Sequence, residues 1–80
     1  MILKPVTSEK AVKLIDLDNT ILFVTERSSR KPEIKKEVEK VLSVKVDSVR
    51  VSIRENKKYA FVKLKKENPA IDVATKLGML

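Results

Sequence analysis

The chain lacks cysteine and histidine and has a single glycine among its 80 residues. Without cysteine it can form no disulfide and offers no thiol nucleophile. Without histidine it also lacks the commonest general base and, with cysteine absent, the usual zinc ligands. One glycine cannot build a glycine-rich phosphate loop, and the acids are dispersed without the spacing of a calcium loop. These absences predict a protein that is not an enzyme and holds neither a cofactor nor a metal.

Long apolar runs are also absent. No stretch approaches the roughly 20 apolar residues of a membrane-spanning helix, and no charged-then-apolar signal peptide opens the sequence. We therefore expect no membrane insertion and a cytoplasmic location. Hydrophobic residues make up 42% of the chain, which suffices for a modest core. The sequence predicts one small domain that spans residues 1–80.

The charge is strongly positive and unevenly placed. Eighteen Lys and Arg residues stand against eleven acids, a formal net charge of +7. Residues 50–66 hold seven of the basic residues and one acid, whereas residues 1–26 hold three basic residues and four acids. Such a field favours a polyanion, above all a nucleic acid. A lysine-rich surface that serves solubility alone is the alternative.

The hydrophobic pattern predicts seven elements and the α+β class, with a mostly antiparallel sheet of up to four strands and about three helices. Two patterns alternate with period two and are joined by a short turn, which predicts a hairpin. In chain order we expect an edge strand at residues 2–3, a helix from a cap at Thr7 or Ser8 to residues 14–16, a central strand over 20–25, a helix over 31–42, strands over 44–53 and 58–65, and a last helix that Asn68 caps and Gly78 ends.

The hairpin carries the most informative pattern. A phase slip at Asp47–Ser48 predicts a β-bulge. If Val51 and Ile53 face the core, the cations of that strand face away from it. One sheet face then gathers cations and two rings, which suits phosphates and unpaired bases. The alternative is a solvated face whose rings the first helix covers. The side chains concerned are Arg50, Arg54, Tyr59, Phe61, Lys63 and Lys65.

A second basic cluster lies in the segment RSSRKPEIKK, at a helix N-terminus. Five basic residues and two serines fall within ten positions there. Free backbone N–H groups and the helix dipole also favour an anion at such a place. The alternative is an ordinary capped loop. The predicted phosphate contacts are Arg27, Ser28, Arg30, Lys31, Lys35 and Lys36.

These features together resemble a known family, that of large-ribosomal-subunit protein twenty-three in its short archaeal form. The resemblance covers nearly the whole chain, and the order and spacing of its short motifs are its strength. They are Pro5, Ser8, Glu9 and Lys10 at the first helix, Asn19-Thr20-Ile21 at the next strand, Lys31, Ile34 and Lys35 at the second helix, Val44, Val46 and Val49, and finally Val62-Lys63-Leu64.

The resemblance implies a three-layer α/β/α fold and a structural role in the large ribosomal subunit. It implies binding to large-subunit ribosomal RNA (rRNA) near the mouth of the peptide exit tunnel, beside neighbouring ribosomal proteins. The hairpin loop at residues 54–57 is too short to reach deep into the tunnel. With the charge pattern, the resemblance assigns rRNA contacts to Lys4, Arg27, Ser28, Arg30, Lys31, Lys35, Lys36, Arg50, Arg54, Lys57, Lys58, Tyr59 and Lys63.

The resemblance also implies a docking platform at the tunnel exit. Its partners would be the signal recognition particle, nascent-chain chaperones and the translocation channel. The docking acid of the family falls on Glu9, with Ser8 beside it, outside the basic part of the chain.

Two other functions stay open from the residues themselves. An RNA-recognition-motif-like domain would read single strands, but it needs glycine-linked aromatics on central strands, which this chain lacks. The other is a small protein-interaction domain with incidental charge.

Overall fold

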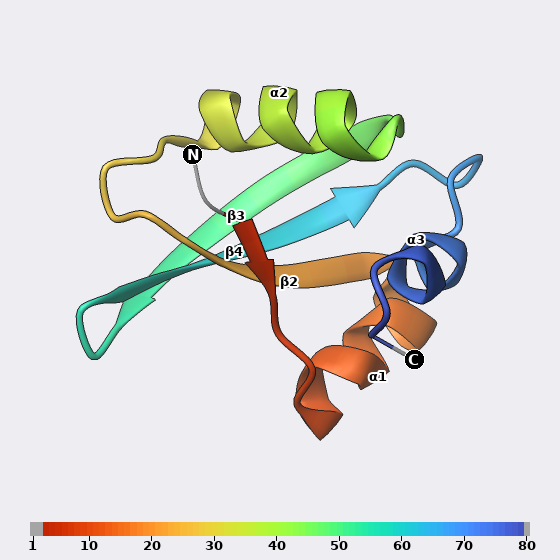
Figure 1. Cartoon of the computed structure of the whole chain (residues 1–80), viewed down its shortest axis with the longest axis horizontal. Helices are drawn as coiled ribbons and strands as arrows, with labels where there is room; N and C mark the ends of the chain where they lie inside the picture. Colours follow the sequence, from red (N-terminus) through yellow and green to blue (C-terminus); the bar gives the residue numbers. More distant parts are fainter. Residues whose placement is uncertain (1–2, 80) are drawn as a thin grey trace.

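The computed structural model describes residues 3–79, which form three helices and one four-stranded antiparallel sheet (Figure 1). The α+β class predicted from the sequence is therefore confirmed. The expected strand residue Ile2 lies outside the described residues. The elements are β1 (Leu3–Pro5), α1 (Glu9–Asp18), β2 (Thr20–Thr25), α2 (Lys31–Leu42), β3 (Val46–Arg54), β4 (Lys57–Leu64) and α3 (Ala70–Lys76).

The strands lie in the order β1-β2-β4-β3, and each neighbouring pair is antiparallel. In Figure 1 α2 lies along β3 toward one edge of the twisted sheet, and α1 and α3 lie together by β2 toward the other; residues of all three helices join one core. β2 is an inner strand, as its apolar residues on both faces predict. The main core lies on the sheet face that carries Ile21, Phe23, Ala60 and Val62, each at most 2% exposed.

Helix α1 begins where the sequence predicts it. Ser8 is its N-cap, and the backbone N–H of Ala11 donates to the Ser8 hydroxyl at 3.2 Å. The helix runs to Asp18, beyond the predicted end at residues 14–16. It ends because Asn19 adopts the left-handed conformation, with φ of 50° and ψ of 36°, which asparagine tolerates better than most residues.

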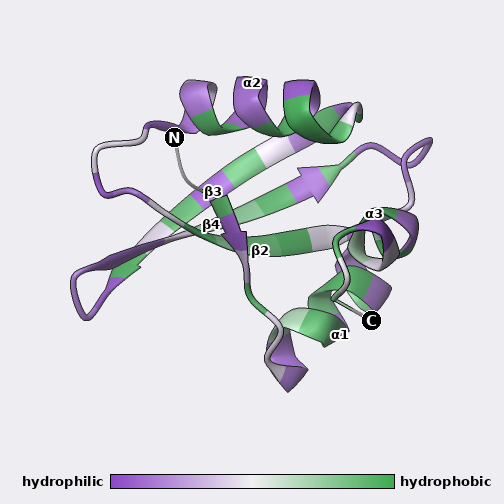
Figure 2. Ribbon diagram, viewed as in Figure 1, coloured by the Kyte–Doolittle hydropathy of each residue, from purple (hydrophilic) through white to green (hydrophobic). Residues whose placement is uncertain are grey.

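Helix α2 has the predicted bounds. Ile34 and Val38 are fully buried, one turn apart, and pack into the core. Figure 2 shows the matching hydrophilic colour on the side of α2 that faces away from the sheet. Val41 was expected to extend this buried stripe, but its side chain is 63% exposed, because the helix turns it away from the sheet.

The hairpin forms as predicted, with a register shift between Val46 and Ser48 that confirms the bulge. Its turn consists of Glu55 and Asn56, with φ of 50° and 63°. Two central residues with positive φ are what a tight two-residue hairpin turn requires. β3 starts two residues later than predicted, and β4 starts one residue earlier than predicted. Ile53 was expected to face the core but is 53% exposed, since it lies near the tip, beyond the reach of the helices.

The last helix is capped differently from the prediction. Asn68 does not cap α3; its side-chain oxygen instead accepts a hydrogen bond from the backbone N–H of Lys45 at 2.7 Å. The first N–H of the helix, that of Ala70, donates to the Asn19 side chain at 2.6 Å. Gly78, with φ of 74°, follows the helix as predicted. Ile71 was expected on the buried stripe but is 49% exposed.

Candidate nucleic-acid interface

The sheet register places most predicted contact residues on one face. On β1 and β4, Lys4 and Tyr59 both pair with Val24 of β2 between them. On β3, Arg50 pairs with Phe61 and Arg54 with Lys57. Because side chains alternate along a strand, these residues share the face opposite the main core. We call this the basic sheet face; it consists of Lys4, Arg50, Arg54, Lys57, Tyr59, Phe61 and Lys63.

The cations of the basic sheet face are exposed, and its two rings are half-buried. The Arg50 guanidinium lies over the Phe61 ring, 5.5 Å from the ring centroid. This cation–π contact orders the long Arg50 side chain before any ligand arrives. Tyr59 lies one row along the same strand and keeps part of its ring accessible. The face therefore offers fixed positive charge beside accessible aromatic surface.

One acid adjoins the basic sheet face. The Lys63 ammonium is 3.7 Å from a carboxylate oxygen of Asp18, at the end of α1, and both side chains are about half exposed. Such an exposed pair contributes little to stability. Lys65 was expected to share this face, but β4 ends at Leu64, so Lys65 lies in the following loop.

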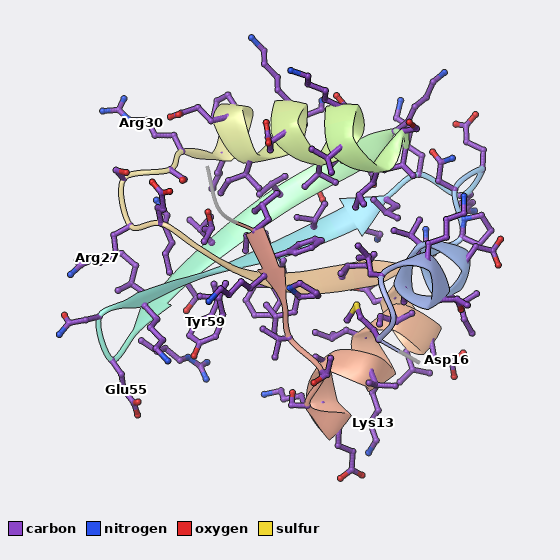
Figure 3. All side chains as sticks on the ribbon, viewed as in Figure 1. Lys13, Asp16, Arg27, Arg30, Glu55 and Tyr59 are labelled. Carbon is purple, nitrogen blue, oxygen red and sulfur yellow. The ribbon has the colours of Figure 1, made fainter. Side chains whose placement is uncertain are left out.

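The loop before α2 is tied to the hairpin. Arg27 donates from its guanidinium to the Asn56 side chain at 3.3 Å. The Lys58 ammonium donates to the backbone oxygens of Arg27, at 3.4 Å, and Ser29. Figure 3 shows Arg27 and Tyr59 at the same end of the molecule as Glu55 in the hairpin turn. The loop part of the second basic cluster thus meets the hairpin in space.

These contacts give Lys58 a structural task that the sequence did not reveal. Its ammonium is occupied by two carbonyl groups, so it holds the loop in place for its neighbours. Ser29, which was not among the predicted contact residues, is 3% exposed and helps to anchor this loop. No local signal distinguishes it from the exposed Ser28, because the difference arises from packing against β4.

The N-terminus of α2 is already occupied by an acid. The backbone N–H of Arg30 donates to the Glu33 carboxylate at 3.3 Å, which is the return half of a capping box. Lys31, Lys35 and Lys36 are exposed along α2. They lie on the helix away from the basic sheet face, so this part of the predicted contact set forms a separate surface.

The predicted docking residues lie apart from both basic clusters. Ser8 and Glu9 are exposed in the first turn of α1. In Figure 3 the α1 residues Lys13 and Asp16 lie far from Arg27 and Arg30, across the molecule. The Ser8 hydroxyl is used as the helix cap, whereas the Glu9 carboxylate is exposed beside the equally exposed Lys10.

Within residues 3–79, no cluster of three or more potential metal-binding side chains was found. The helices of this part of the chain are all too short or too polar to cross a membrane.

Residues 1–74 match the family model described as Ribosomal protein L23. The chain belongs to this family. It is also 39% identical, over 99% of its length, to the large ribosomal subunit protein uL23 of Methanothermobacter thermautotrophicus, of which the match covers 93%. The resemblance seen in the sequence motifs is therefore confirmed, and the chain is a ribosomal protein.

Proposed function

We propose that this L23-family protein is a structural component of the large subunit of the cytoplasmic ribosome and binds large-subunit rRNA near the peptide exit tunnel. The basic sheet face supplies the main contact, and the loop at residues 27–30 extends it beyond the hairpin. The outer lysines of α2 provide a second, smaller contact. The role is architectural and involves no catalysis.

The observation that carries this proposal is the gathering of five cations and two partly accessible rings on one sheet face. Arginine and lysine side chains neutralise phosphates, and aromatic rings and guanidinium planes stack on unpaired bases. Incidental charge in a protein-interaction domain gives no reason for five cations and two accessible rings to share one sheet face. An RNA-recognition-motif-like mode is disfavoured because the chain lacks the glycine-linked aromatics of that motif.

The proposal predicts a steep salt dependence of rRNA binding. If the five cations of the basic sheet face each contact a phosphate, the slope of log K against log salt concentration should be about −3.5 to −4.5. We expect this from a titration of the purified protein with protein-free large-subunit rRNA. A slope near zero, or equal binding to unrelated RNA of the same length, would contradict the proposal.

We further propose that the α1 end receives factors that act on nascent chains, namely the signal recognition particle, chaperones and the translocation channel. Glu9 is the residue that supports this assignment, because it is an exposed acid outside the basic field. We expect Glu9→Lys to leave ribosome incorporation nearly unchanged and to weaken factor binding to purified ribosomes, measured by co-sedimentation.

Asp72→Lys is the matched control for this prediction. Asp72 is likewise an exposed acid in the first turn of a helix, α3, so both variants change the net charge equally and place a lysine in the first turn of a helix. Only Glu9→Lys should impair factor binding. Loss of incorporation by Glu9→Lys alone would instead give this residue a structural role.

A further inference from the structure

The basic sheet face contains a small hollow at the end nearest α1. It has a volume of about 290 Å³ and is lined by Asp18, Thr20, Ser48, Arg50, Phe61 and Lys63. Five of these residues come from two adjacent rows of the sheet: Thr20, Lys63 and Ser48 pair across three strands in one row, and Phe61 pairs with Arg50 in the next. The hollow is therefore part of the rigid sheet and not of a loop.

The lining of the hollow is chemically divided. Arg50 and Lys63 bring two positive charges from neighbouring strands, and Phe61 forms an apolar wall under Arg50. Asp18 brings a carboxylate to the rim beside Lys63, 3.7 Å from its ammonium. The Thr20 hydroxyl, in a residue that is 2% exposed, donates to Asp18 at 2.9 Å through the backbone oxygen and 3.3 Å through the carboxylate. The carboxylate is thus held by a hydrogen bond from Thr20 and by an ion pair with Lys63.

A continuous RNA backbone alone does not explain this arrangement. A surface that bound only phosphates would gain from having no acid beside Lys63, since a carboxylate repels them. A carboxylate accepts hydrogen bonds and cannot donate them. Its natural partner is a donor, such as a base amino group or a ribose hydroxyl. A ligand that carries both an anionic group and a hydrogen-bond donor fits this lining, with Arg50 and Lys63 as partners of the anion and Asp18 as partner of the donor.

We propose that this hollow holds one unpaired nucleotide of the rRNA, turned out of its stack. Its phosphate lies against Lys63 and Arg50, and its base lies against the Phe61–Arg50 stack. A donor on the nucleoside meets Asp18, and the hydroxyl of Ser48 closes the side. The volume of about 290 Å³ is close to the lower end of the range for small-ligand pockets, which suits one nucleotide. This inference rests on the proposed rRNA binding and names the form of RNA recognised.

The decisive variant fills the hollow while leaving the rest of the face intact. Ser48 is exposed, so Ser48→Trp should fold and block the nucleotide. Thr75→Trp is the control, because Thr75 is an exposed residue on α3. We expect Ser48→Trp to bind protein-free large-subunit rRNA about 5- to 150-fold more weakly, the range that stacking of one base provides. Chemical probing should show that wild-type protein protects an unpaired nucleotide and that Ser48→Trp no longer does.

Asp18→Ala gives a second test, because the two possible roles of Asp18 predict opposite changes in rRNA affinity. If Asp18 only repels phosphates, its removal also frees Lys63 and should tighten rRNA binding. If it accepts from the bound nucleoside, binding should weaken severalfold despite the gain in positive charge. Tighter or unchanged binding by Asp18→Ala would overturn its assigned role in the hollow.

The outcomes separate this inference from the proposed function. Failure of the wild-type protein to bind rRNA with a salt-dependent affinity would contradict the proposed function itself. Normal binding and an unchanged footprint with Ser48→Trp would overturn only the nucleotide hollow. Normal rRNA binding with lost incorporation into subunits would assign the hollow to a neighbouring ribosomal protein and likewise overturn the inference.

Discussion

Asn19→Gly should destabilise the protein by about 2–3 kcal/mol, the largest effect that we expect from a single polar substitution. The Asn19 side-chain amide donates to the backbone oxygens of Leu64, Lys65 and Asn68 at 3.0–3.3 Å and accepts from Ala70 at 2.6 Å. Glycine accepts the left-handed backbone readily, so the loss reflects the hydrogen bonds. Leaving such partly buried groups unpaired costs about 1–3 kcal/mol each, and water will replace the exposed ones.

The measurement is thermal and urea-induced unfolding, followed by circular dichroism. For a domain of this size, 2–3 kcal/mol corresponds to a fall in melting temperature of about 8–24 °C. Asn56→Gly is the matched control, because Asn56 also has positive φ but its side chain accepts only from the exposed Arg27. We expect the free energy of unfolding of that variant to lie within about 1 kcal/mol of the wild-type value. Equal effects of the two variants would show that the Asn19 network is unimportant.

The contacts of Asn19 also mark the limit of what the sequence could reveal. The residue was predicted only as part of a turn, because Asp18-Asn19 is local turn chemistry. Its partners lie 45 to 51 positions away, and no local pattern encodes them. The same network explains why the predicted Asn68 cap of α3 was wrong. The backbone N–H of Ala70 donates to the Asn19 side chain, and the Asn68 side chain accepts from the backbone N–H of Lys45 instead.

Elements with strong periodicity were predicted well. The strand at Thr20–Thr25 and the helix at Lys31–Leu42 have the predicted bounds, since each is marked by apolar spacing and by polar or proline residues at its ends. The bulge between Val46 and Ser48 was visible as a phase slip. These signals are local, and the tertiary packing of these elements agrees with them.

The exposed apolar residues were predicted less well. Val41, Ile53 and Ile71 continue apolar patterns beyond the area that the sheet and helices can cover. A small domain buries only a limited part of its surface, so some residues of its apolar patterns stay exposed. Periodicity predicts which side of an element faces inward, whereas the extent of the covering layer depends on the whole fold.

The candidate site divides in the same way. Alternation along the hairpin correctly placed Arg50, Arg54 and Lys63 on one face. The sequence could not show that Lys4 joins them through β1, or that Lys58 holds the loop at Arg27. Both facts depend on strand order and on contacts between distant segments. The hollow beside Asp18 likewise requires the end of α1 to meet the sheet.

The triple substitution Arg50→Ala, Arg54→Ala and Lys57→Ala should have the largest effect on RNA binding. These cations lie on neighbouring positions of the hairpin, with Arg54 directly opposite Lys57. If each neutralises one phosphate, the salt slope should fall in magnitude by about 2–2.7. Extrapolated from 1 M to 0.15 M salt, this change corresponds to an affinity loss of about 100-fold. Titrations of rRNA at four or more salt concentrations provide the measurement.

A second triple variant separates local contacts from net charge. Lys10, Lys13 and Lys76 are exposed on α1 and α3, and their replacement by alanine removes the same three charges. This variant should keep most of the slope, because long-range attraction is screened within about 8–10 Å at physiological salt. Equal losses in both variants would mean that the protein attracts RNA by its overall charge. A loss confined to the hairpin variant would identify the basic sheet face as the surface that meets the phosphates, since only contact-range cations release counterions on binding.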